Sequence, residues 1–169
     1  SWTEKGIGYA SSKDLITWSE QKFIPVMAHE EGVRNCWAPE ITYDKKSGTY
    51  MIYWATTIDG RFTETVEPKE SNLSHRMYAT TTKDFKTFSP TFLLYDHGFS
   101  VIDSTIIPDG DRFVMFLKDE TRSPVAQKNI RVSYAEKLEG PYSAPSEPIT
   151  GKYWAEGPTV LREADGSWV

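Results

Sequence analysis

The chain has 169 residues, the size of one compact domain, and carries 24 acidic against 19 basic residues. No block of one charge sign is long enough to form a nucleic-acid-binding arm, and no apolar stretch is long enough to span a membrane, so we expect neither partner. Cys36 stands alone, which excludes an internal disulfide and a cysteine-based metal cluster, while 6 Trp, 9 Tyr and 8 Phe give an aromatic content typical of sugar-binding clefts and all-β cores.

Short runs rich in β-branched and aromatic residues recur between clusters of Gly, Pro, Asp and Ser. Few segments show a sustained helical period, so the sequence predicts an all-β fold. The expected strands, in chain order, are IGYAS (7–11), EITYD (40–44), TYMIYWATT (49–57), HRMYATT (75–81), STIIPD (104–109), RFVMFLKD (112–119), NIRVSYAE (129–136) and PTVLRE (158–163).

Two interleaved repeats run through these elements. SSKDLITWS (11–19) aligns with TTTKDFKTFS (80–89) at an offset of 70 residues from Ser11 onward, and VSYAEKLEGPYSAP (132–145) is a looser third copy. The second repeat is a short strand, a turn and a longer apolar strand. Its equivalent positions Ile41, Ile106 and Val160 are separated by 65 and then 54 residues. Steps of that size, with about four strands each, are typical of the blades of a β-propeller.

Counting the copies predicts a partial propeller with about three four-stranded antiparallel blades. The polar segments 59–74 and 119–128 are expected to be loops at a blade face. Because a propeller closes on itself to remove its sheet edges, we expect the chain to be a fragment of a larger ring. The expected parts are the end of the first blade (1–30), the second blade (31–97), the third blade (98–150) and the start of the fourth (151–169).

The starts of the inner strands are the candidate functional positions, because inner strands line the channel of a propeller. They are CWAPE (36–40), VIDST (101–105) and WAEGP (154–158), and each offers a carboxylate near bulky apolar residues. Carboxylates that converge on one pocket can hydrolyse a glycosidic bond, one as the acid and another as the base. Apolar neighbours and a second nearby charge would raise the pKa of the acid.

The ordered motifs SKDLITW, CWAPEITYD, IDSTIIPDGDRFVMF and AEGPTVLR resemble glycoside hydrolase family 43, whose fold is a five-bladed β-propeller. The resemblance covers essentially the whole chain. It implies that Glu156 is the general acid and that Asp103 tunes the pKa of this acid and orients it. The general-base aspartate of the first blade is expected upstream of Ser1, so we expect the isolated chain to be inactive.

The resemblance also implies the reaction, which is hydrolysis with inversion in plant-type polysaccharides or oligosaccharides. The implied substrates are α-L-arabinofuranosides or β-D-xylosides, with no cofactor, and a secreted or periplasmic location is favoured over a cytoplasmic one. Trp37 and Trp154 have flat faces suited to a sugar ring. Glu40 either binds substrate or braces its blade by accepting backbone N–H groups. His29, His75 and His97 lack metal-ligand spacing, so no metal site is predicted.

Other interpretations stay open at this point. Asp103 could be a turn residue that bonds the backbone, and Glu156 a solvated loop residue. The whole chain could be a carbohydrate-binding propeller without activity, since a fold does not fix a function. A sialidase-like propeller is a further alternative, because SKDLITW is similar to an Asp-box turn, although it lacks the glycine and one more residue before the tryptophan.

Overall fold

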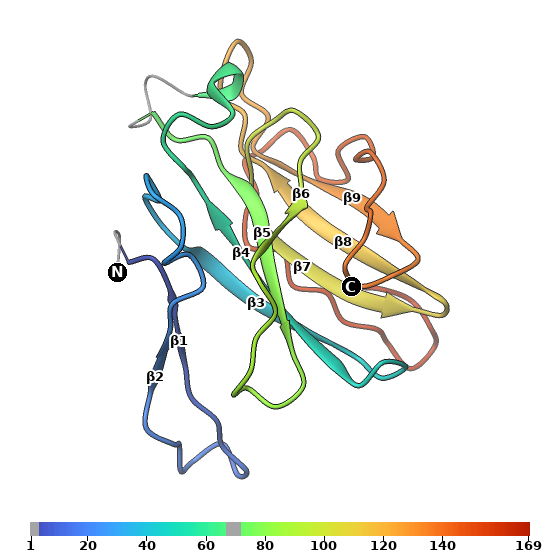
Figure 1. The fold of residues 1–169 in the computed structure, drawn as a ribbon. Helices are drawn as coiled ribbons and strands as arrows, with labels where there is room; N and C mark the ends of the chain where they lie inside the picture. Colours follow the sequence, from blue (N-terminus) through green and yellow to red (C-terminus); the bar gives the residue numbers. More distant parts are fainter. Residues whose placement is uncertain (1–3, 67–71) are drawn as a thin grey trace.

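The computed structural model describes residues 4–66 and 72–169, and these form three antiparallel β-sheets (Figure 1). The first sheet pairs β1 (Ile7–Tyr9) with β2 (Lys22–Ile24), and the second has the order β3 (Trp37–Asp44), β4 (Thr49–Thr56), β5 (Arg76–Thr82) and β6 (Phe92–Tyr95). The third contains β7 (Val101–Asp109), β8 (Arg112–Asp119) and β9 (Asn129–Ala135). A 3-10 turn at Thr63–Thr65 is the helical element of the described residues, so the all-β prediction is confirmed.

The one expected strand that is wrong is PTVLRE (158–163). Instead of joining a sheet, this segment folds back on the last residues of the chain, with a bridge between Arg162 and Trp168. Leu161 and Val169 exchange two backbone hydrogen bonds of 2.8 and 3.0 Å. Because only these few backbone pairs form, the segment is a short hairpin at the end of the described chain and not a strand of a sheet. The strands β2 and β6, of three and four residues, were not expected.

The turn repeat at an offset of 70 residues has the same hydrogen bonds in both copies. Asp14 Oδ1 accepts the backbone N–H groups of the second and third residues after it, at 2.9 and 2.8 Å. Asp84 Oδ1 does the same at 2.8 and 2.9 Å. In the third copy Ser143 Oγ accepts a backbone N–H from β9 at 3.1 Å, as Ser89 Oγ does from β5 at 2.9 Å. The repeat in the sequence is therefore a repeat in the structure.

The second sheet has four strands, as expected for a blade, and the third has three. An extended segment occupies the fourth position of the third sheet. Pro145 and Pro148 lie in this segment and lack the N–H groups that a regular ladder requires. The backbone N–H groups of Ser143, Ser146 and Ile149 nevertheless donate to the carbonyl oxygens of Tyr134, Val132 and Ile130 at 2.8, 2.8 and 2.9 Å.

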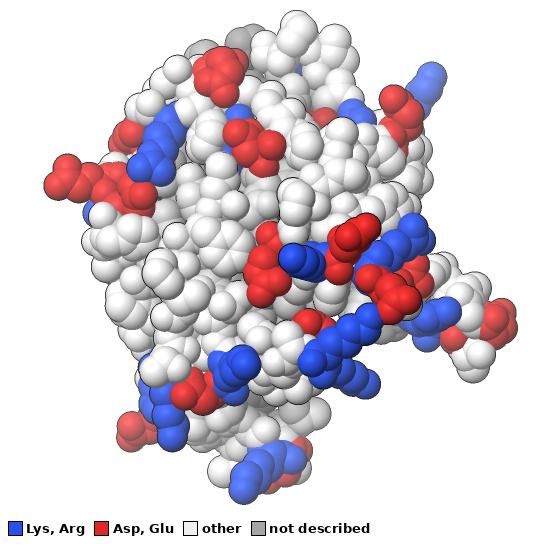
Figure 2. All heavy atoms as spheres, turned by 45° about the vertical axis from the view of Figure 1, so that its right-hand side comes forward, with Lys and Arg blue, Asp and Glu red and all other residues white. Residues whose placement is uncertain are grey.

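Both signs of charge are present on the face of the molecule that Figure 2 shows, without a large patch of one sign there. On the face shown in Figure 2, basic and acidic side chains lie interspersed. Within residues 4–66 and 72–169, no helix has the length and apolar character needed to cross a membrane.

The second and third sheets are joined by a buried hydrogen-bond chain centred on Tyr53. The backbone N–H of Ile106 donates to the Tyr53 hydroxyl at 2.8 Å. That hydroxyl lies 3.1 Å from Thr42 Oγ1, which donates to the carbonyl oxygen of Ile106 at 2.7 Å. Burial raises the pKa of Tyr53 to about 12, so its hydroxyl stays neutral. The chain fixes β3 against β7, the two strands that carry the candidate site.

Tyr53→Phe tests this link. The substitution keeps the buried ring but leaves the Ile106 N–H without its acceptor, so we expect a loss of about 1–3 kcal/mol in the free energy of unfolding. Urea unfolding followed by fluorescence measures it. Tyr43→Phe, at an exposed position of β3, is the matched control and should change stability by less than about 0.5 kcal/mol. Equal stability of the two variants would contradict the role of the Tyr53 hydroxyl.

Candidate active site

The inner strands of the second and third sheets begin with the same backbone irregularity. In β3 one extra residue lies between Trp37 and Glu40 relative to β4, and in β7 one lies between Ile102 and Thr105 relative to β8. Each bulge contains a residue with positive φ, Ala38 at 47° and Asp103 at 53°. Such bulges re-aim side chains, and they recur beside active sites.

The bulged positions follow the sequence repeat. Ala38 and Asp103 are separated by the 65-residue step, and the 54-residue step leads from Asp103 to Gly157, whose φ is 59°. Gly adopts this conformation without strain, whereas for Asp and Ala it is uncommon. The three candidate strand starts therefore share a positive φ at the equivalent position.

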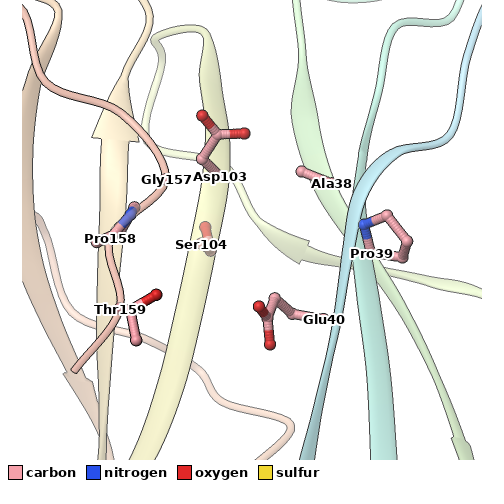
Figure 3. Close-up of a pocket in the computed structure, with 8 residues that line it drawn as sticks. All are labelled: Ala38, Pro39, Glu40, Asp103, Ser104, Gly157, Pro158 and Thr159. Atoms are coloured by element: carbon pink, nitrogen blue, oxygen red, sulfur yellow. The ribbon is translucent and has the colours of Figure 1, made fainter. Parts of the chain in front are cut away.

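These three starts converge on one pocket of about 120 Å³ (Figure 3). In Figure 3 the Glu40 carboxylate extends from β3 into the space between the strands, and Asp103 lies on the facing strand β7. Ser104 is buried at this pocket, and its Oγ has no hydrogen-bond partner within the described part of the chain. The pocket is lined by Ala38, Pro39, Glu40, Asp103, Ser104, Gly157, Pro158 and Thr159.

Asp103 is half-buried at the wall of this pocket. Burial raises the pKa of its carboxyl, because the charged form loses solvation. The positive charge of Lys118 and a hydrogen bond from the Gly157 backbone N–H oppose this shift, and the negative charge of Glu156 adds to it. Asp103 thus interacts with the segment that carries Glu156.

Glu156 itself points into a second pocket, of about 150 Å³, which is lined by Lys118, Arg122, Lys128, Trp154, Ala155 and Glu156. Its side chain is 74% exposed, and its Oε2 accepts a hydrogen bond from Lys118 Nζ at 2.6 Å. This pairing lowers the pKa of Glu156. The two pKa directions are the reverse of the expectation, in which the acid has the raised pKa. The cause at Asp103 is burial, and the cause at Glu156 is Lys118, which lies directly against it.

The three residues predicted to bind substrate, Trp37, Glu40 and Trp154, differ from one another in their surroundings. Trp37 is half-buried, and its ring lies 5.1 Å from the ring of His75, away from the lining of the pocket at Asp103. Trp154 is 69% exposed. Glu40 is exposed at that pocket, and in the part of the chain that the structure describes its carboxylate accepts no hydrogen bond, so the bracing interpretation finds no support.

Comparison with known proteins decides the family. A family model described as "Probable glycosyl hydrolase domain", related to glycoside hydrolase family 43, matches residues 3–169. The chain belongs to this glycoside hydrolase 43-related family. The sialidase-like alternative therefore falls away.

Individual relatives agree with this family. An α-L-arabinofuranosidase of Bifidobacterium longum subsp. longum is 34% identical over 89 residues, which are 50% of this chain and 8% of that protein. The solved structure of a β-xylosidase, RS223, has a TM-score of 0.57 at 16% identity, over 78% of this chain and 41% of the other. A β-xylosidase/α-arabinofuranosidase from a compost microbial metagenome, solved with xylotriose, has a TM-score of 0.55 at 16% identity, over 78% and 40%.

The two structures establish the fold of this glycoside hydrolase 43-related chain, a partial β-propeller, as expected. The chain spans about two fifths of the two solved proteins and less than a tenth of the arabinofuranosidase.

Sequence reasoning missed the basic residues around Glu156 in this glycoside hydrolase 43-related chain. Lys118 and Lys128 are buried, and both bind the Glu120 carboxylate, Lys118 at 2.8 Å. A signal was present, because a lysine inside the apolar run RFVMFLKD is unusual for a buried strand. The sequence alone does not show the strand register, which pairs Lys118 of β8 with Ile102 of β7, next to Asp103.

The histidines of the described residues do not form a group of metal ligands. Burial and nearby cations lower the pKa of His75 to about 4, so it is neutral, and its Nε2 lies 3.0 Å from Asn35 Nδ2. Over residues 4–66 and 72–169, His, Cys, Asp and Glu side chains form no group of three or more that could hold a metal ion.

Proposed function

We propose that this chain is part of the catalytic domain of a glycosidase that hydrolyses arabinofuranosides or xylosides of plant-type polysaccharides with inversion. In this proposal Glu156 is the general acid, and Asp103 tunes and orients it. One observation carries the proposal. Asp103 lines the pocket at which the starts of β3 and β7 meet residues 157–159, the segment directly after Glu156. The general base is proposed to come from a part of the ring outside residues 1–169.

The substrate class rests on the relatives. The similar proteins are an arabinofuranosidase and β-xylosidases, which are the two activity classes that the sequence motifs imply. Trp154 adds an exposed aromatic face beside Glu156, which suits the apolar side of a sugar ring.

The acid role requires a change at Glu156. Without substrate, Lys118 holds the carboxylate in its ionised form. To protonate a glycosidic oxygen, the Glu156 side chain has to leave Lys118, and cover by the apolar face of the sugar then favours the protonated form. Because this side chain is mostly exposed, little packing resists the movement.

A carbohydrate-binding propeller without activity is the second candidate, because the pairing of Glu156 with Lys118 would also suit a site that only binds. A release assay separates the two. A protein that carries this chain within a closed ring is given 4-nitrophenyl α-L-arabinofuranoside and 4-nitrophenyl β-D-xyloside. Release of 4-nitrophenol that depends on Glu156 supports the glycosidase, and binding without release supports the second candidate.

Asp103→Asn tests the tuning role. Asn tolerates positive φ, so the bulge should be kept, while the charge beside Glu156 is lost. We expect kcat/KM to fall about ten- to a hundredfold and the basic limb of the pH–rate profile to be displaced. Asp109→Asn, at the far end of the same strand, is the control. An unchanged profile for Asp103→Asn would favour the turn interpretation.

A further inference from the structure

Lys118 is a buried cation that lies between two carboxylates. Its side chain is only 7% exposed, and its Nζ lies 2.6 Å from Glu156 Oε2 and 2.8 Å from Glu120 Oε2. The two carboxylates differ in their surroundings, because the Glu156 side chain is 74% exposed and the Glu120 side chain is 17% exposed. Glu156 is therefore the partner that can move away from Lys118, and Glu120 is the partner that stays.

Glu120 is held in place by its backbone and by further cations. It directly follows β8, and its backbone N–H donates to the carbonyl oxygen of Ser100 at 2.8 Å. Its Oε1 binds the buried Lys128, and Arg122 Nη2 lies 3.6 Å from the same oxygen. With Oε1 occupied by these cations, the other carboxylate oxygen faces Lys118.

This second oxygen of Glu120 is an unused acceptor beside Lys118. Oε2 is buried and, within the residues that the structure describes, accepts no hydrogen bond, although Lys118 Nζ is 2.8 Å away. Lys118 directs its hydrogen bond to Glu156 instead. An ammonium group has three N–H donors that rotate together, so Lys118 can turn one of them to Glu120 without displacing its nitrogen.

Glu156 can act as an acid only if Lys118 tolerates its departure, and this step rests on the proposed function. A buried ammonium group that is left without a partner is strongly unfavourable. We propose that Glu120 is a positioning residue that retains Lys118 in place when Glu156 leaves it to protonate the glycosidic oxygen. Glu120 acts through Lys118 and has no contact with the substrate in this proposal.

Other charged and titratable groups face Lys118 and Glu156. Asp103 matters most among them, because Lys118 and Lys128 both lower the pKa of its carboxyl and it therefore attracts Lys118 as well. A test of Glu120 has to separate its effect from that of Asp103. The facing groups are Asp103 on β7, Glu120 and Arg122 after β8, Lys128 before β9, and the neutral His75 before β5.

Glu120→Gln tests the proposal. With Glu120 uncharged, Lys118 depends more on Glu156, so Glu156 should be held more firmly as a carboxylate and its pKa should fall further. Carboxyl NMR titration of Glu156 in the 169-residue chain measures this without any need for turnover. In a closed ring that contains the chain, the basic limb of the pH–rate profile should move to lower pH and kcat should fall about threefold or more.

Matched variants separate positioning from stability. Glu120→Asp retains the charge and should leave the Glu156 titration nearer to its original position than Glu120→Gln does. Asp96→Asn removes a carboxylate that binds the buried Arg76 at 2.5 Å, so it should lower stability without moving the Glu156 titration. In the Lys118→Met background, Glu120→Gln should shift this titration by less than about half of its shift in the unaltered chain.

If Glu120→Gln does not fold, Glu156→Gln gives the reciprocal measurement. This variant removes the charge of Glu156 from Lys118 while Glu120 remains, so the urea midpoint of the 169-residue chain should fall far less than in Lys118→Met. Equal losses in the two variants would show that Glu120 does not retain the lysine.

Two further results would overturn the proposal. One is a Glu156 titration that Glu120→Gln leaves in place, in which case the charge of Asp103 is sufficient to retain Lys118. The other is a shift that persists in full in Lys118→Met, because Glu120 would then act by another route. Failure of the glycosidase proposal is distinct from both, since it shows as absent release of 4-nitrophenol whatever the titrations give.

Discussion

In a closed ring that contains this chain, Glu156→Gln is expected to lower kcat/KM by about 10²- to 10⁴-fold on glycosides with a poor leaving group. Gln keeps the shape and the hydrogen-bonding capacity of the side chain but has no proton to donate to the departing oxygen. The 74% exposed side chain contributes little packing, so the loss should appear in turnover rather than in folding. Steady-state kinetics on an alkyl or oligosaccharide glycoside measure the effect.

The leaving group supplies the internal control for this prediction. A 2,4-dinitrophenyl glycoside departs without protonation, so its hydrolysis should suffer far less from Glu156→Gln than hydrolysis of the alkyl glycoside. Glu163→Gln removes an exposed carboxylate from the nearby terminal hairpin and should leave both rates unchanged. An equal loss on the two substrates would argue that Glu156 acts in binding, and an unchanged rate on both would remove it from the mechanism.

The fold was largely predictable because the repeats carry it. Ile41 and Ile106 lie at the same place in two inner strands, and the turns at Asp14 and Asp84 have the same hydrogen bonds. Periodicity cannot report strands as short as β2 and β6. It also fails for PTVLRE, because an alternating pattern predicts a strand only where a partner strand is available to pair with it.

The sequence motifs single out the two candidate carboxylates but do not report their electrostatics. Asp103 and Glu156 occur in recognisable motifs, and the structure places Asp103 in one pocket lining with Gly157, the residue directly after Glu156. The lowered pKa of Glu156 depends instead on which side chain of β8 lies opposite β7. That register places Lys118 across from Ile102, next to Asp103 and against Glu156. No local pattern in the sequence reports a cross-strand pair of this kind.

Lys118→Met is the second large change that we expect. Lys118 lowers the pKa of Glu156 and also that of Asp103, so its removal should raise both. For an acid catalyst the active form is protonated, and activity falls as the pH rises through the pKa of the acid. A higher pKa of Glu156 therefore moves the basic limb of the pH–rate profile to higher pH, which increases the protonated fraction of Glu156 near neutrality.

Although Lys118→Met should increase the protonated fraction of Glu156, it should lower the stability of the fold. Lys118 is buried and binds Glu120, so its loss should lower the free energy of unfolding by about 1–3 kcal/mol, as measured by urea unfolding. Lys118→Arg retains the charge and should keep the limb near its original position, and Lys86→Met, at an exposed turn, controls for loss of a lysine elsewhere. Carboxyl NMR titration of Glu156 in the 169-residue chain gives a readout independent of turnover. A Glu156 titration curve that stays in place in Lys118→Met would show that the ion pair does not set its protonation, and Glu156 would then need no movement away from Lys118 to act as the acid.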